Sequence, residues 1–147
     1  MQAFPHHYKV TASASAESNI TLTTEGVDSL LSAPPAQFGG PGDHWSPEDL
    51  LVAAVADCFI LTFRAIAKFN GLDWTALECS ATGTLDKDGR KTCFTAFEVS
   101  AKLEVPEGTD AEKAHKLLEK SEESCLVTNS LKAEVTLIAE VTIKPHP

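Results

Sequence analysis

Residues 46–59, SPEDLLVAAVADCF, decide the fold, because they open the longest helix that the sequence predicts. Ser46 is a good N-cap, Pro47 suits the first helical position, and the two acidic residues that follow complement the helix dipole. Asn70-Gly71 supplies the stop signal. Between these signals the helix is apolar almost all round until Arg64, so nearly every side of it must be covered. A chain this short has little else to cover it, and we infer an obligate homodimer with paired central helices.

The segments on either side of this helix alternate apolar and polar residues, as half-buried strands do. Strands are predicted over residues 8–14, 20–24, 77–85, 93–105 and 134–144, with a hairpin turn at Asp88-Gly89. The stretch 25–45 is rich in glycine and proline, which is typical of turns and loops. Thr109 and Glu112 form a capping box that opens a second helix, ending at Cys125. This order predicts a single α+β domain over residues 1–147, with antiparallel sheets around the central helices.

Charge and hydropathy exclude several classes of function. The net charge is −9 and the twelve basic residues form no patch, so nucleic acid is an unexpected partner. The N-terminus lacks the basic start and apolar run of a signal peptide. The apolar stretch Leu50–Leu61 is interrupted by Asp57 and falls short of the roughly 20 residues of a membrane span. We therefore expect a cytoplasmic protein without a membrane partner, in a compartment that keeps thiols reduced.

The four cysteines stand in two kinds of context. Cys58 lies within the long helix and Cys125 ends the second one, too far apart in sequence for a CxxC motif or a compact zinc knuckle. Any partnership between them must come from the fold. Cys79 and Cys93 occupy apolar strand faces, which favours core packing for both. Four histidines have no metal-like spacing with the cysteines, so we expect neither a metal nor a cofactor; they are His6, His7, His115 and His146.

Two stretches carry a resemblance to a known family. One is Ser46-Pro-Glu-Asp-Leu-Leu51 followed by Ala53-Ala-Val-Ala-Asp-Cys-Phe59, and the other is Cys125-Leu-Val-Thr-Asn-Ser-Leu131. Together they resemble the OsmC/Ohr family of osmotically inducible and organic-hydroperoxide-resistance proteins. The likeness extends over essentially the whole chain, including the Gly39-Gly-Pro-Gly loop and the final strand.

The resemblance implies a thiol-dependent peroxidase that reduces organic hydroperoxides, built as an intertwined homodimer with its site at the interface. Cys58 would match the peroxidatic cysteine, Cys125 the resolving one, and Glu48 the glutamate of the family's Pro-Glu motif. A dithiol, in the family typically a lipoylated protein, would reset the pair. Apolar walls from Trp45, Phe59 and Phe63 would favour hydroperoxides with a carbon tail.

Glu48 cannot serve the thiol of its own chain in this scheme. Ten residues separate it from Cys58 on one helix, which is about 15 Å along the axis. If Glu48 belongs to the site, it comes from the partner subunit. The family's peroxidases also carry an arginine in an early strand-turn region, whereas the matching stretch 14–19 holds no basic residue. His44, just ahead of the helix, is the candidate to replace that charge on the substrate side.

Two other classes of function stay open from the residues alone. One is an OsmC-like protein that binds a small hydrophobic ligand without catalysis. The other is a redox sensor in which a disulfide between Cys58 and Cys125 alters an interaction. Turnover with a dithiol distinguishes the enzyme from both.

Overall fold

The computed structural model describes residues 1–145 of the chain, and His146 lies outside the described residues. The chain divides into two compact units, Met1–Leu51 and Val52–Pro147. Strands and helices occur together in it, which confirms the α+β class. The expectation of one domain over residues 1–147 stays a prediction.

The first unit contains a small antiparallel sheet of three short strands. These are β1 (Thr11–Ser13), β2 (Ile20–Thr23) and β3 (Leu30–Ser32), with β2 in the centre. The sequence interpretation placed the residues of β3 in a loop, because three residues are too few to show an alternating pattern. A loop with the 3₁₀ turn η1 (Ala36–Phe38) follows. It is closed by a hydrogen bond from the Ala33 N–H to the Trp45 carbonyl, at 2.9 Å.

The long helix α1 (Pro47–Phe69) has the two ends that the sequence predicts. The buried Ser46 hydroxyl accepts a hydrogen bond from the Asp49 N–H at 3.0 Å, as an N-cap does. At the other end, Gly71 adopts a left-handed conformation with φ 64°. The Leu72 N–H reaches the Ala67 carbonyl at 2.9 Å and the Gly71 N–H reaches that of Lys68 at 3.3 Å. This pair of bonds is a Schellman motif, for which glycine is the preferred residue.

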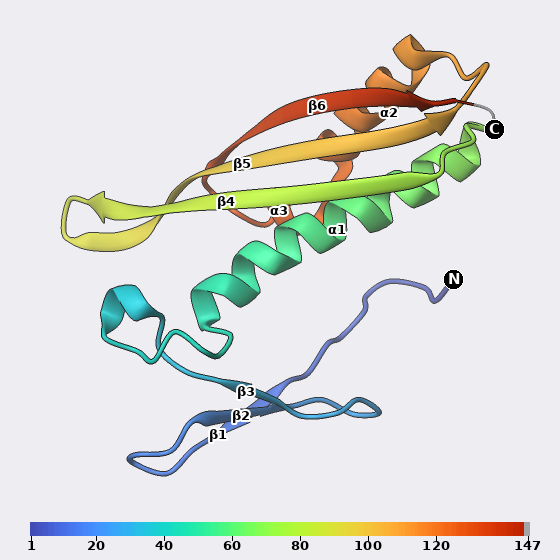
Figure 1. Ribbon diagram of the computed structural model, residues 1–147. Coiled ribbons are helices and arrows are strands. Elements are labelled where there is room, and N and C mark those ends of the chain that lie inside the picture. The colour runs from blue at the N-terminus through green and yellow to red at the C-terminus, as the bar shows by residue number, and fades with distance from the viewer. Residues whose placement is uncertain (146–147) are drawn as a thin grey trace. The chain divides into compact units, whose positions relative to one another are not determined.

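The second unit is built on a mixed sheet (Figure 1). Its strands are β4 (Ala76–Asp88), β5 (Lys91–Pro106) and β6 (Glu134–Lys144), with β5 in the centre. β4 and β5 form the expected antiparallel hairpin, but β6 runs parallel to β5, which corrects the prediction of antiparallel sheets. The physical reason is the helical crossover between these strands, since a helix carries the chain back to start the next strand in the same direction.

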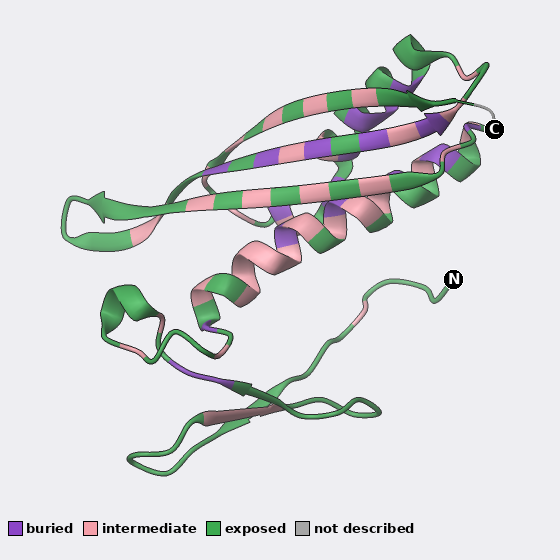
Figure 2. Cartoon of the chain, in the orientation of Figure 1, coloured by how far each residue is buried: buried purple, intermediate pink, exposed green. Residues whose placement is uncertain are grey.

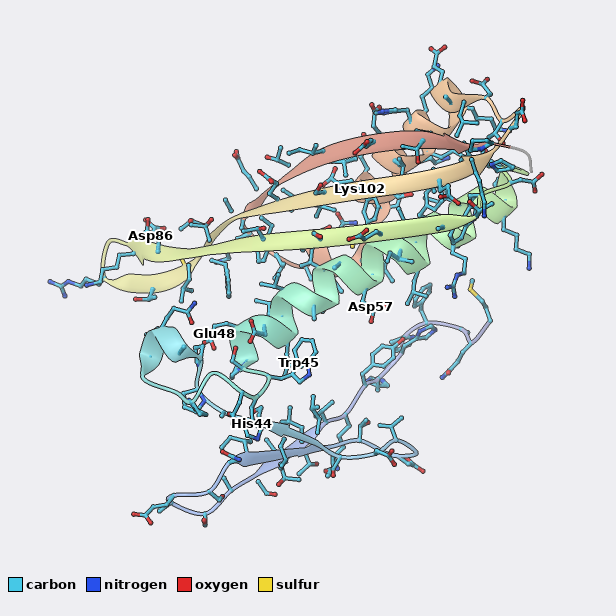
Figure 3. The ribbon with its side chains drawn as sticks, in the orientation of Figure 1. His44, Trp45, Glu48, Asp57, Asp86 and Lys102 are labelled. Atoms are coloured by element: carbon cyan, nitrogen blue, oxygen red, sulfur yellow. The ribbon has the colours of Figure 1, made fainter. Side chains whose placement is uncertain are left out.

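One face of this sheet is buried and the other is exposed. The buried residues of β5 alternate with exposed or half-buried ones along the strand (Figure 2); they are Phe97, Val99, Ala101, Leu103 and Val105. α1 runs along one face of the sheet (Figure 1), and its own buried residues are spaced four apart; they are Val55, Phe59, Phe63 and Ala67. Lys102 stands on the exposed face (Figure 3).

A β-bulge in the hairpin reverses the face of Cys93. Cross-strand partners shift between Thr84 and Leu85, so Phe94 pairs with Leu85 and Cys93 pairs with Asp86. Paired residues of an antiparallel ladder share a face, and Asp86 lies on the face opposite to Leu85. Cys93 therefore points away from the face of Phe97, contrary to the prediction that it faces the core.

Two helices form the crossover from β5 to β6. They are α2 (Ala111–Ser124) and the single turn α3 (Leu126–Asn129), and Cys125 is the residue between them. The N-cap of α2 is Asp110, not the predicted Thr109. Its carboxylate accepts hydrogen bonds from the N–H groups of Glu112 and Lys113 at 3.0 and 3.2 Å. Two accepted bonds satisfy more of the free N–H groups than the single bond of a threonine hydroxyl.

α1 is more apolar over a greater length than the sequence interpretation allowed. Among the described residues, α1 is long and apolar enough to cross a membrane. In the most apolar 18-residue stretch of α1, 22% is buried. The one charge of Asp57 does not interrupt that stretch. Length and composition are weak evidence for a membrane span, because the central helix of a globular protein has the same pattern. The expectation of no membrane partner stays a prediction.

Candidate functional site

Neutral hydrogen-bond donors surround the Cys58 thiol. Its Sγ lies 3.8 Å from the Thr62 Oγ1, one helical turn further along α1. The backbone N–H groups of Leu126 and Val127, at the start of α3, and the Cys125 thiol also hydrogen-bond to it. The fold therefore brings the two cysteines together, from α1 and from the junction between α2 and α3.

These contacts make Cys58 more acidic than an ordinary thiol. Burial raises the pKa of Cys58, since it disfavours the charged form. Hydrogen bonds from Val127, Cys125, Thr62 and Leu126 lower that pKa and outweigh the effect of burial. The net pKa lies below the ordinary value. A lower pKa means more thiolate at neutral pH, and the thiolate is the nucleophilic form.

Cys125 and Cys79 complete a group of three thiols on the inner side of the second unit. All four cysteines of the chain are free, and Cys125 is 1% exposed. Burial raises the pKa of Cys79 to about 11. Cys79 is therefore a protonated thiol at neutral pH. Cys58 combines partial exposure with a lowered pKa, whereas the pKa of Cys79 is raised.

The donors to Cys58 differ in how far the sequence could reveal them. Thr62 lies four residues after Cys58 in a predicted helix, so its position next to the thiol follows from helical spacing. The N–H groups of Leu126 and Val127 carry no side-chain signal, because any residue other than proline supplies an N–H. Their contribution depends on the tertiary fold.

Glu48 lies in the first turn of α1, within the first unit (Figure 3). Its Oε1 is buried and has no hydrogen-bond partner among the described residues. It lines a cavity of about 390 Å³ whose walls come entirely from the first unit. Its predicted role beside the thiol of a partner subunit stays a prediction.

His44 and Trp45 precede α1 (Figure 3). The His44 Nδ1 lies 2.6 Å from the Asp43 Oδ1, and its Nε2 lies 3.4 Å from the Asn19 Nδ2. The side chain of Trp45 is 49% exposed, while its backbone is paired with Ser32. His44 is therefore held by a carboxylate of its own loop, and its predicted role toward the substrate stays a prediction.

Phe59 and Phe63 are fully buried core residues. They are 1% and 0% exposed, and the Phe63 ring packs edge to face against Trp74 at 5.5 Å. Their predicted role as walls of a substrate site stays a prediction. Within residues 1–145 no group of three His, Cys, Asp or Glu side chains could hold a metal ion.

One known family matches most of the chain. The family model described as OsmC-like protein matches residues 40–140, which include both cysteines of the site. The chain belongs to the OsmC-like protein family. This confirms the resemblance drawn from the sequence motifs.

Relatives of this OsmC-like chain bear names of two kinds. The protein YmaD of Bacillus subtilis (strain 168), named as uncharacterized, is 28% identical over 145 residues, which is 95% of each chain. Peroxiredoxin OsmC of Escherichia coli (strain K12) is 32% identical over 92 residues, covering 63% of this chain and 64% of that protein. One of these relatives is therefore named as a peroxiredoxin.

Solved structures share the fold over nearly the whole chain. An OsmC-like protein of unknown function from Vibrio cholerae has a TM-score of 0.81 at 20% identity, covering 94% of this chain and all of that one. An organic hydroperoxide resistance protein from Legionella pneumophila has a TM-score of 0.72 at 25% identity, covering 94% and 99%. These similarities support an α+β OsmC-like fold for the chain.

Proposed function

We propose that this OsmC-like protein is a thiol-dependent peroxidase that reduces organic hydroperoxides. The observation that carries the proposal is the Cys58 thiol, whose pKa is lowered while a second buried thiol, Cys125, hydrogen-bonds to it. Relatives named peroxiredoxin and organic hydroperoxide resistance protein support the same chemistry. The cytoplasm is the expected location, because the cycle needs a reducing partner.

The proposed cycle has three balanced steps. The Cys58 thiolate attacks the terminal oxygen of the O–O bond and becomes a sulfenic acid, while the other oxygen leaves as an alkoxide that takes a proton from water and departs as the alcohol. The Cys125 thiol then attacks the sulfenic sulfur, which forms a disulfide and releases water. A dithiol, such as a lipoylated protein, reduces this disulfide to two thiols and is itself oxidised to a disulfide. The proximity of Cys125 favours the second step over further oxidation of Cys58.

The activation of Cys58 needs no basic side chain in this proposal. Backbone N–H groups and a hydroxyl stabilise the thiolate, and such hydrogen bonds to a charged group are worth about 1.5–3 kcal/mol each. They take the role that the family's arginine performs in other members. Glu48 of the partner subunit would then complete the site in a homodimer.

Peroxide consumption tests the proposal directly. The reduced protein is mixed with cumene hydroperoxide or with hydrogen peroxide, and peroxide loss is followed with dihydrolipoamide as the reductant. We expect fast loss of the organic peroxide in wild type and background loss in Cys58→Ser. Cys125→Ser should react once and then accumulate sulfinic acid at Cys58, detected as a mass increase of two oxygens.

A matched control separates these effects from general loss of a thiol. Cys93→Ser changes a cysteine on the opposite face of the sheet and should leave turnover unchanged. Equal activity of wild type and Cys58→Ser would contradict the proposal. Unchanged turnover in Cys125→Ser would contradict its resolving role.

A ligand-binding function is the second candidate. The observation that favours it is the cavity of about 390 Å³ in the first unit, whose size suits a small organic molecule. If the protein shows no peroxide turnover but binds a ligand in this cavity, the binding function is favoured over the enzyme.

A further inference from the structure

The second unit has a hollow at the C-terminal end of α1, which we call the Arg64 pocket. Its walls come from the last two turns of the helix and from the segment that leads into β4, so all of them belong to the second unit. The volume of about 360 Å³ lies within the usual range of small-molecule sites. The lining combines two basic side chains, one carboxylate and one indole ring, which are those of Arg64, Lys68, Asp73 and Trp74.

The two basic side chains of the Arg64 pocket have no partner of opposite charge. Arg64 and Lys68 lie one turn apart on the same side of α1. Neither side chain forms an ion pair or a hydrogen bond within residues 1–145. No acidic residue lies three or four positions from either of them in the sequence. Like charges at this spacing destabilise a helix, so an anion that contacts both side chains relieves a repulsion.

The carbonyl groups at the end of α1 do not compete for these cations. The Ile66 carbonyl accepts hydrogen bonds from the backbone and side-chain N–H groups of Asn70, at 3.0 and 2.8 Å. The carbonyls of Ala67 and Lys68 accept the two bonds of the Schellman motif. The Asn70 carbonyl accepts a hydrogen bond from the Lys113 Nζ of α2 at 2.8 Å. A lysine often binds the last carbonyls of its own helix, but here Lys113 does so and the Lys68 ammonium stays available.

The ring of Trp74 gives the pocket a fixed apolar wall. It packs edge to face against Phe63, with ring centroids 5.5 Å apart. The N–H of the next residue, Thr75, donates to the Glu104 carbonyl of β5 at 2.8 Å. The indole is half-buried, and its N–H has no acceptor within the described part of the chain. Trp74 therefore offers a ring surface and one hydrogen-bond donor that are in place before a ligand arrives.

We propose that the Arg64 pocket binds a small organic carboxylate with a planar apolar body, whose carboxylate lies between Arg64 and Lys68 and whose body packs against Trp74. A guanidinium matches a carboxylate with two parallel hydrogen bonds. Asp73 is the one acidic side chain of the lining, and it repels a second negative charge. The two cations outnumber it, so the pocket repels an amine. The site therefore prefers a monoanion to a dianion, an amine or an alcohol of similar shape.

The inference is independent of the chemistry at Cys58, which is not among the lining residues. The test uses the full-length, reduced Trp45→Phe protein, in which Trp74 is the single tryptophan and reports on the pocket by its fluorescence. Titrations at low ionic strength compare 3-phenylpropionate with 3-phenylpropan-1-ol and 3-phenylpropylamine. We expect the carboxylate to bind about tenfold more tightly than the alcohol, and the amine not to bind. The affinity for the carboxylate should fall in about 0.5 M salt, since salt screens exposed charges.

Charge-removing variants and a matched control locate the binding. Arg64→Gln and Lys68→Gln should each weaken the carboxylate about fivefold and leave the alcohol unchanged. Both side chains are exposed, so the fold tolerates these changes. Arg90→Gln removes the other arginine of the chain, in the turn between β4 and β5, and should change nothing.

Asp73 is tested with a ligand that carries one more charge. Benzylmalonate adds a second carboxylate to 3-phenylpropionate and should bind more weakly than 3-phenylpropionate. Asp73→Asn removes the repulsion, so this variant should bind benzylmalonate at least as tightly as the monoanion.

Several outcomes would overturn the inference. Equal affinity for the carboxylate and the alcohol, or no change of Trp74 fluorescence at millimolar concentration, removes the site. An equal loss in Arg90→Gln and Arg64→Gln reduces the effect to net charge. Because peroxide turnover is measured separately in wild type, failure of either proposal leaves the other standing.

Discussion

At Cys58, burial and hydrogen bonding act on the thiol pKa in opposite directions, and the hydrogen bonds prevail. At Cys79, burial raises the pKa to about 11. The sequence distinguished these two cysteines correctly as helix and strand residues. It could not predict which donors surround Cys58, because two of them are backbone N–H groups brought from the far end of the chain.

Alkylation at varied pH should separate the two cysteines. The reactive form is the thiolate, whose fraction increases with pH through the pKa, so a lowered pKa moves reactivity to lower pH. Cys58 should react with iodoacetamide at a lower pH than an ordinary thiol, whereas Cys79 should stay unreactive until the pH approaches about 11. Mass spectrometry of tryptic peptides after timed quenching measures both rates in one sample.

Thr62→Val is the matched variant for this measurement. Valine keeps the shape of threonine and removes the hydroxyl that hydrogen-bonds to Cys58. We expect the Cys58 profile to move upward by about one pH unit, since one bond to a charged group is worth about 1.5 kcal/mol. Thr82→Val, at an exposed position of β4, should leave the profile unchanged, and an equal shift in both variants would contradict the assignment.

Among the elements, the long helix was predicted well and the sheet less well. The ends of α1 follow from Ser46, Pro47 and Gly71, whose side chains or lack of one act locally. The bulge opposite Thr84 and Leu85 and the parallel course of β6 depend on which strands meet. Such pairings are tertiary, so periodicity alone cannot reveal them.

The N-cap of α2 offers a test at this scale. Asp110→Ala removes the acceptor of two backbone N–H groups and should lower the free energy of unfolding by about 1 kcal/mol. Asp110→Asn keeps an accepting oxygen and should retain most of the stability. Urea denaturation followed by circular dichroism measures both. A loss in Thr109→Ala larger than in Asp110→Ala would assign the cap to the residue that the sequence favoured.

For the whole molecule, the distribution of buried residues favours association with a second copy. In Met1–Leu51 the buried residues are Ser32, Ala33 and Ser46, which is too few for a core. In the second unit, large apolar side chains of α1, α3 and β6 remain exposed, such as Leu61, Leu126 and Ile138. An intertwined homodimer would cover the poorly buried first unit as well as these apolar side chains of the second unit. This extends the sequence argument, which rested on the apolar surface of α1 alone.

Mixed dimers test whether Glu48 acts across the interface. A dimer of one Glu48→Gln chain and one Cys58→Ser chain keeps one intact site only if the glutamate comes from the partner. Joint refolding of the two variants in equal amounts should restore about a quarter of wild-type turnover, because half of the dimers are mixed and each holds one intact site. Glu48 serving its own chain would give no recovery above the separate variants.

The donors to Cys58 also set when its reactivity appears during synthesis. Cys58 leaves the ribosome early, whereas the N–H groups of Leu126 and Val127 follow much later. Until then the nascent chain carries a cysteine of ordinary acidity, exposed to peroxide but slow to react with it. In the proposed cycle, Cys58 thus becomes reactive only when its resolving partner, Cys125, is already in place. A growing chain is thus spared the irreversible oxidation that an active but unpaired thiol would suffer.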